Sequence, residues 1–184
     1  MTIDLSGSGM LAITRDALTA LCAALMRDTG PAAAGYLQEA GYAGGGALFD
    51  AFRQWLGSRG LGEPASLSVD VFQQEAAEFF RLAGWGSLQV GALHDMVATL
   101  DSPDWGEATT DSVLEQPGCH LSAGIFADFF GRVADAPLAV MEVECRSAGA
   151  DRCRFLLGST EVMQAVYEQM SHGAGYADAV GASA

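Results

Sequence analysis

The stretch that decides the fold consists of LAVMEVEC at 138–145, a turn with AGAD at 148–151, and RCRFLL at 152–157. Apolar residues dominate both arms, and a segment that contains glycine separates them, a pattern typical of a β-hairpin. Antiparallel pairing of the two arms would bring Cys145 and Cys153 towards each other across the turn.

Outward from this hairpin, the hydrophobic spacing predicts helices on both sides and two weaker strands before it. The expected helices are 14–27, 31–39, 48–56, 68–83, 121–133 and 160–170, and the expected strands are 87–93 and 96–100. Gly44-Gly45-Gly46 is expected to break the chain between the second and third helices. Leu48, Phe52 and Trp55 form an apolar stripe, suited either to the core or to an interface between subunits.

These expectations define an α+β fold in which N-terminal helices pack on an antiparallel sheet, followed by the hairpin and a final helix. We expect one domain over 1–184, with an N-terminal helical part at about 10–84 and a motif core at about 118–157. The tail at about 173–184 is rich in glycine and alanine and is expected to fray.

The charge balance excludes several classes of partner. Nine arginines, no lysine and 23 acidic residues give a net charge of −14 over 184 residues. Such a chain repels phosphate backbones and anionic lipid surfaces, so we expect neither nucleic-acid nor membrane binding. The N-terminus has Asp4 in place of a basic leader, and no apolar run is long enough to span a bilayer. We therefore expect a cytoplasmic protein with reduced thiols.

Three of the four cysteines lie in the last third of the chain and predict a metal site. Cys145 and Cys153 flank the hairpin turn, and Cys119 precedes a helix, where unpaired N–H groups favour a thiolate. Three thiolates and one further ligand make a closed tetrahedral zinc site. The residues leave the fourth ligand open among Glu142, Glu144 and His120, and they leave open three cysteines close together without a metal. Cys22 fits the apolar face of the first helix and is interpreted as a core residue.

Four segments resemble the 4-vinyl-reductase domain family. They are CHLSAGIF at 119–126, MEVEC at 141–145, AG at 148–149 and DRCRF at 151–155. The family contains small-molecule sensor domains of transcription activators, hydrocarbon-binding proteins and proteins linked to bacteriochlorophyll synthesis. Its fold is related to nitric-oxide sensors and to subunits of vesicle-tethering complexes.

The resemblance implies the metal ligands Cys119, Glu142, Cys145 and Cys153, holding Zn²⁺. On a regular strand, residues three apart point to opposite faces, so Glu142 and Cys145 can share a metal only if a bulge or a strand end lies near Val143 or Glu144. Without such an irregularity, His120 becomes the better fourth ligand. Three thiolates and one carboxylate leave no open coordination position, so we expect a structural rather than a catalytic metal.

The resemblance also implies an apolar ligand pocket between the helices and the sheet. The residues expected to line it are Trp85, His94, Met96, Trp105, Phe126, Phe129 and Phe130. Each of these side chains can equally be an ordinary core residue. The sequence carries no phosphate-binding loop and no nicotinamide or flavin motif, which argues against a reductase activity.

The main hypothesis is a non-enzymatic, zinc-stabilised binding or sensing domain for a small hydrophobic, for example aromatic, molecule. It would act through a protein partner in trans and, as in the family, as a homodimer. The alternative is a bacteriochlorophyll-synthesis protein that carries or assembles a porphyrin. A third hypothesis is a purely structural subunit, as in the related tethering proteins.

Overall fold

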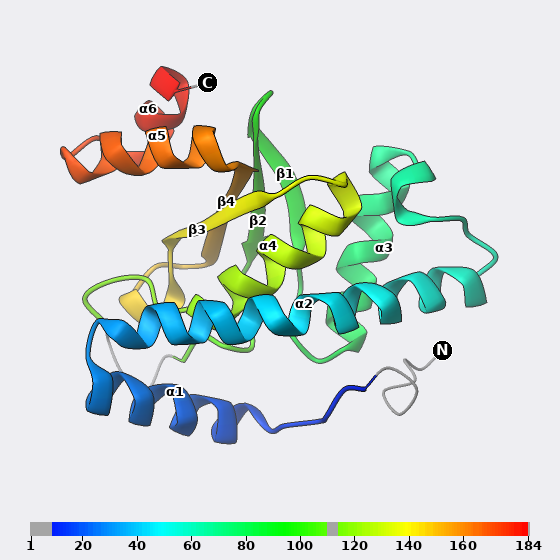
Figure 1. The fold of residues 1–184 in the computed structure, drawn as a ribbon, viewed down its shortest axis with the longest axis horizontal. Helices are drawn as coiled ribbons and strands as arrows, with labels where there is room; N and C mark the ends of the chain where they lie inside the picture. Colours follow the sequence, from blue (N-terminus) through cyan, green and yellow to red (C-terminus); the bar gives the residue numbers. More distant parts are fainter. Residues whose placement is uncertain (1–8, 110–113, 184) are drawn as a thin grey trace.

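The structure is a computed structural model that describes residues 9–109 and 114–183. Its elements are α1 (Arg15–Thr29), α2 (Ala32–Ser58), the short 3-10 helix η2 (Pro64–Ser66), α3 (Val69–Leu82), β1 (Gln89–His94), β2 (Val97–Ser102), α4 (His120–Ala134), β3 (Leu138–Glu144), the 3-10 turn η3 (Arg146–Ala148), β4 (Cys153–Ser159), α5 (Thr160–Ser171) and α6 (Tyr176–Ser183) (Figure 1). The α+β class predicted from the sequence is confirmed.

The four strands form one antiparallel sheet in the order β1-β2-β4-β3. The predicted hairpin is β3–β4, and β2 lies on the other side of β4. Alternate residues of each strand face opposite sides, as the side-chain period of two requires. On β4, Phe155 belongs to the core under α4, whereas Leu156 belongs to a second apolar cluster under α5 and α6.

The main core is aromatic and is closed by α2, α3 and α4. Phe52, Phe79, Phe80, Phe126 and Phe129 are fully buried. Neighbouring rings in this group have centroids 5.1–6.4 Å apart, the separation at which aromatic pairs attract each other.

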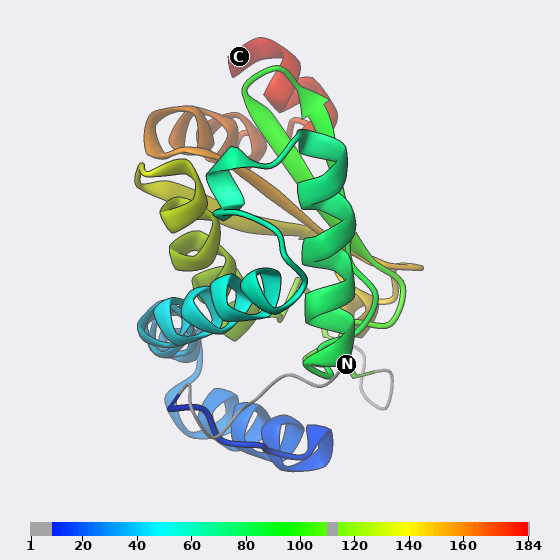
Figure 2. The same cartoon turned by 90° about the vertical axis from the view of Figure 1, so that its right-hand side faces the viewer.

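The stripe that the sequence left between core and interface is core. Leu48, Phe52 and Trp55 are at most 7% exposed. Their helix, α2, lies between the sheet side of the molecule and α1, as both views show (Figures 1 and 2).

The predicted break at Gly44–Gly46 is wrong, because α2 runs through these glycines as one helix of 27 residues. The reason is a close crossing with α4. A Cβ on Gly41 would overlap the carbonyl oxygen of Leu121, and a Cβ on Gly124 would overlap that of Gln38. Glycine weakens a helix by its flexibility, but here it permits two backbones to touch, and the packing outweighs the cost.

The predicted fraying of the C-terminal tail is also wrong for the part that the structure describes. Residues 176–183 form α6, whose Ala179 and Val180 are buried against α5 and the outer face of the sheet. The Tyr176 hydroxyl donates to Glu144 Oε1 at 2.5 Å and accepts from Arg154 at 3.1 Å. Helix α6 is thereby tied to both strands of the hairpin. None of the helices within 9–109 and 114–183 has the length and apolarity needed to cross a membrane.

Candidate metal centre

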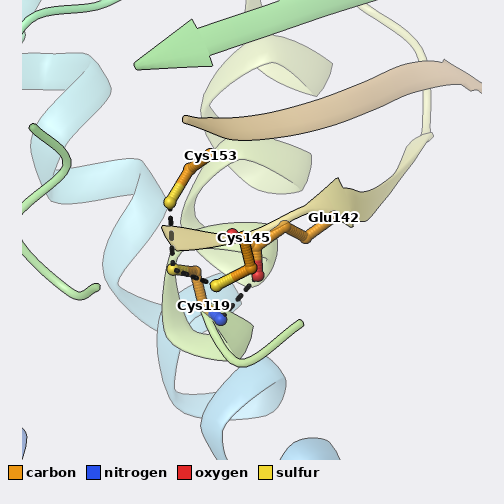
Figure 3. A group of neighbouring side chains, drawn as sticks. All are labelled: Cys119, Glu142, Cys145 and Cys153. Carbon is orange, nitrogen blue, oxygen red and sulfur yellow. Dashed lines mark hydrogen bonds between the residues drawn. The ribbon is translucent and has the colours of Figure 1, made fainter. Parts of the chain in front are cut away.

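The hairpin and the start of α4 bring four side chains to one point (Figure 3). Cys119 is the residue before α4, and Glu142 lies near the end of β3. Cys145 follows β3 directly, and Cys153 is the first residue of β4. The side chains named by the family resemblance are therefore neighbours in the structure, although they span 35 positions of the sequence.

The spacing of the sulfur atoms fits a tetrahedral metal. The Sγ atom of Cys119 lies 3.9 Å from that of Cys145 and 3.8 Å from that of Cys153. Two ligands of a tetrahedron with Zn–S bonds of about 2.3 Å are about 3.8 Å apart. One ligand atom from each of the four residues lies within 4.8 Å of the others. The arrangement can hold one divalent cation without moving the backbone.

A β-bulge in β3 brings Glu142 and Cys145 to the same side. The pairing with β4 shifts between Glu142, which faces Phe155, and Glu144, which faces Arg154. One extra residue, Val143, is thus accommodated in β3. Val143 packs in the outer cluster and Glu144 bonds to Tyr176, so both point away from the metal side. The irregularity that the Glu-x-x-Cys spacing required is present, and the prediction of a bulge here is confirmed.

Glu142 has one oxygen engaged and one oxygen free for a cation. Its Oε2 atom accepts a hydrogen bond from the backbone N–H of Cys119 at 2.8 Å. Its Oε1 atom is buried and has no hydrogen-bond partner among the described residues. Burial, and next the neighbouring Cys145, raise the pKa of Glu142 to about 8. A bound cation would reverse this penalty, because it supplies the missing positive charge.

The thiols compete for charge while no cation lies among them. Hydrogen bonds from the thiols of Cys119 and Cys153 lower the pKa of Cys145, and the bond to Cys145 raises that of Cys119. Three thiolates can coexist only around a positive centre. His120 is the first residue of α4 and lies outside the cluster, with its pKa lowered by burial. Cys22 lies half-buried in α1, outside the cluster too.

A second carboxylate, Glu107, holds the first turn of α4 and was missed by the sequence reasoning. Its two oxygens accept hydrogen bonds from the backbone N–H groups of Leu121, at 3.0 Å, and Ser122, at 2.7 Å. The Ser122 hydroxyl also donates to Glu107, and it accepts from the indole N–H of Trp105 at 2.7 Å. Only the position of Glu107 at the end of a polar turn, 12 residues before Cys119, hinted at this role.

The side chains predicted to form a ligand pocket do not gather around one cavity. Trp105, Phe126, Phe129 and Phe130 are buried in the aromatic core. His94 and Met96 are exposed at the turn between β1 and β2. Of the seven, Trp85 lines a cleft, and it also stacks on Trp105 with ring centroids 5.5 Å apart.

This cleft, of about 410 Å³, opens between the N-terminal segment and the crossing of α2 and α4. The segment before α1 forms one wall, and small residues of α2 form the floor. The lining comprises residues 9–15, Leu18, Ala40, Gly41, Gly44, Ala47, Leu48, 83–85, Gly106, Leu121 and Ile125. Because Leu121 and Ile125 belong to α4, the helix that begins at Cys119 also borders the cleft.

Comparison with known families places the metal cluster in a defined domain. The family model of the 4-vinyl-reductase (or vinyl-4-reductase) domain matches residues 110–159, a range that includes all four clustered residues. An uncharacterized protein of Methanocaldococcus jannaschii is 28% identical over 78 residues, which are 42% of this chain. The chain spans about two fifths, 41%, of that relative's length.

Three solved structures share the fold. The phenol-responsive sensory domain of the transcription activator PoxR, solved with phenol, has a TM-score of 0.64 at 18% identity, over 84% of this chain and 78% of its own. A vinyl-4-reductase family protein from Methanocaldococcus jannaschii has a TM-score of 0.53 at 17% identity, over 80% and 82%. Subunit 3 of the trafficking protein particle complex from Naegleria fowleri, covalently bound to palmitic acid, has a TM-score of 0.59 at 14% identity, over 78% and 91%. The chain therefore carries a 4-vinyl-reductase domain, as its sequence resemblance predicted.

Proposed function

We propose that this chain is a non-enzymatic, zinc-stabilised domain that binds or senses a small hydrophobic molecule and acts through a protein partner. The observation that carries the proposal is the position of α4. Its start supplies Cys119 to the metal cluster, and its next two turns supply Leu121 and Ile125 to the apolar cleft. A metal that fixes the start of this helix also fixes one wall of the cleft.

The donor set supports a structural role for the metal. Cys119, Cys145 and Cys153 would bind Zn²⁺ as thiolates and Glu142 through its free oxygen, which gives a site with a net charge of −2. Such a site has no vacant position for water and little Lewis acidity. When bound, the metal supplies a crosslink between the hairpin and α4, and its binding free energy becomes folding free energy.

The cleft supports ligand binding. Its lining is almost wholly apolar, and its volume lies in the range of small-molecule sites. The fold shared with the phenol-responsive domain of PoxR is consistent with such a role. We propose further that the chain is a single domain, that it forms a homodimer, and that it works in the cytoplasm.

Metal analysis combined with native mass spectrometry tests the zinc site. We expect one zinc per chain, loss of that zinc in Cys145→Ser, and full zinc in the control Cys22→Ser, whose thiol lies outside the cluster. The same spectra report the oligomeric state and any copurified ligand. A metal-free protein that is insensitive to added zinc would contradict the site. A Soret absorption band would favour the porphyrin alternative.

Binding of aromatic compounds to a blocked cleft tests the ligand site. A Cβ on Gly44 or on Gly35 meets no atom within 4 Å, and both glycines lie on α2. Gly44 lines the cleft and Gly35 does not. We expect a panel of aromatic compounds to raise the melting temperature of the wild type and of Gly35→Leu, and to leave Gly44→Leu unchanged. Equal responses of the two variants would place the binding elsewhere.

A further inference from the structure

The apolar cleft contains one charged side chain, that of Arg15, the first residue of α1. The other residues around it are apolar or glycine, apart from Thr14. A charge in such a place needs a partner, because an apolar wall offers a guanidinium no acceptor.

Arg15 has no carboxylate partner within the described part of the chain. Seven of the nine arginines form ion pairs with aspartate or glutamate there, and Arg15 and Arg146 do not. In a chain with 23 acidic residues, an arginine without a carboxylate is the exception. Arg146 lies in the hairpin turn and does not border the cleft.

The guanidinium of Arg15 is nevertheless held in place. Its Nη2 atom donates to the carbonyl oxygen of Gly84 at 2.9 Å. It also lies against the backbone of Gly106, where a Cβ would come within 3.1 Å of Nε. A guanidinium carries five N–H donors, so donors remain for an anion. A basic residue in the first turn of a helix also opposes the helix dipole, so Arg15 does not stabilise α1 through that dipole.

We propose that the cleft binds a small amphipathic carboxylate. Its apolar body would lie against Leu18, Leu48, Leu121 and Ile125, and its carboxylate would pair with the guanidinium of Arg15. Guanidinium and carboxylate match in geometry and can share two parallel hydrogen bonds. This inference rests on the proposed function, since it assigns the chemical class of the ligand that the same cleft takes.

Two probes with the same ring system separate the carboxylate from the apolar body. At pH 7, 2-naphthoate is an anion and 2-naphthol is neutral. Isothermal titration calorimetry on the full chain should show tighter binding of 2-naphthoate. Arg15→Gln should weaken 2-naphthoate about tenfold and change 2-naphthol by no more than about twofold, because only the ion pair is lost. Arg15→Lys should restore part of the affinity for 2-naphthoate, since it restores the charge without the planar fork.

Arg27→Gln is the matched control, since it removes one positive charge from the exposed end of the same helix. We expect it to leave the affinity for both probes unchanged. Gly44→Leu should abolish the binding of both, which locates the ligand in the cleft.

Equal affinity for the two probes, unaffected by Arg15→Gln, would overturn the carboxylate and leave the proposed function intact. Failure of 2-naphthoate to bind the wild type would also overturn it. Failure of every aromatic compound in the panel would overturn the proposed function itself.

Discussion

Two carboxylates hold the first turn of α4 from different sides. Glu142 accepts from the N–H of Cys119, and Glu107 accepts from the N–H groups of Leu121 and Ser122. Both use the unpaired donors and the positive end of the helix dipole. Glu142 has an oxygen left for a cation, whereas Glu107 is only 7% exposed and is bonded within the protein. Glu107 thus fixes the helix from which Cys119 must point.

Glu107 should make stability depend on pH. Burial raises its pKa from 4.5 to about 7, and the hydrogen bonds from Ser122 and Leu121 only partly oppose that shift. A carboxyl whose folded pKa is raised resists ionisation in the folded state. Its contribution to the free energy of unfolding is therefore full below the ordinary pKa and is lost as pH rises from about 4.5 to about 7. The expected loss is of the order of a few kcal/mol.

Urea unfolding of the wild type and Glu107→Gln at pH 5, 6 and 7 measures this contribution. The difference between the two free energies cancels the titration of the metal ligands, which both proteins share. We expect the wild type to lose stability relative to Glu107→Gln across this range. Parallel pH profiles would show that Glu107 ionises normally in the folded protein.

At the scale of the element, the crossing of α2 and α4 depends on glycines whose positions are not equivalent. Gly41 and Gly124 face the other helix, and Gly44 faces the cleft. The sequence predicted the strands and most of the helices because their signals are local. It could not predict α2 as one helix, because the reason for its glycines is a partner helix about 80 residues further along. The cleft was missed for the same reason, since its walls come from distant segments.

Alanine substitutions along α2 should therefore have opposite effects. Gly41→Ala should lower the free energy of unfolding by more than about 2 kcal/mol, because its Cβ would overlap the backbone of α4. Gly44→Ala should raise it by about 0.5–1 kcal/mol, the gain in helix propensity at a position with open space. Denaturant unfolding measures both. A loss of similar size in the two variants would exclude the close crossing as the cause.

Helix α6 should be released by a change of one hydroxyl. Tyr176→Phe removes the hydrogen bonds to Glu144 and Arg154, each worth about 1 kcal/mol. We expect faster amide hydrogen exchange over 176–183 and little change in α1 to α4. Tyr167→Phe, on an exposed part of α5, is the control and should leave exchange unchanged. If α6 exchanges at the same rate in both variants, the apolar contacts of Ala179 and Val180 hold it alone.

At the scale of the whole molecule, the metal would join the two parts that the fold keeps apart in sequence. Cys119 belongs to the helical layer and the other three ligands to the hairpin. The spacing of the cysteines and the family resemblance predicted this cluster, because two of its members flank a single turn. The positions of Glu107 and Arg15 could not be predicted, since each depends on contacts between remote segments.

Removal of the metal should loosen one side of the molecule first. Chelation of the holoprotein should lower the free energy of unfolding by at least about 3 kcal/mol, because binding free energy is folding free energy. Hydrogen exchange should rise first in β3, β4 and the first turn of α4, and α1 should stay as it was. Added zinc should restore both quantities. Uniform loosening of the whole chain, or none, would contradict a crosslink at this point.

The irregular point at Val143 has a consequence for both sides of the sheet. The extra residue turns Glu142 and Cys145 inwards together, and it leaves two neighbours, Val143 and Glu144, pointing outwards, one into the apolar cluster beneath α5 and α6 and one to Tyr176. A strand straightened here would misalign a pair of ligands and at the same moment withdraw a foothold from the last helix. One inserted residue thus serves two surfaces that never touch, which is why its value cannot be judged from either surface alone.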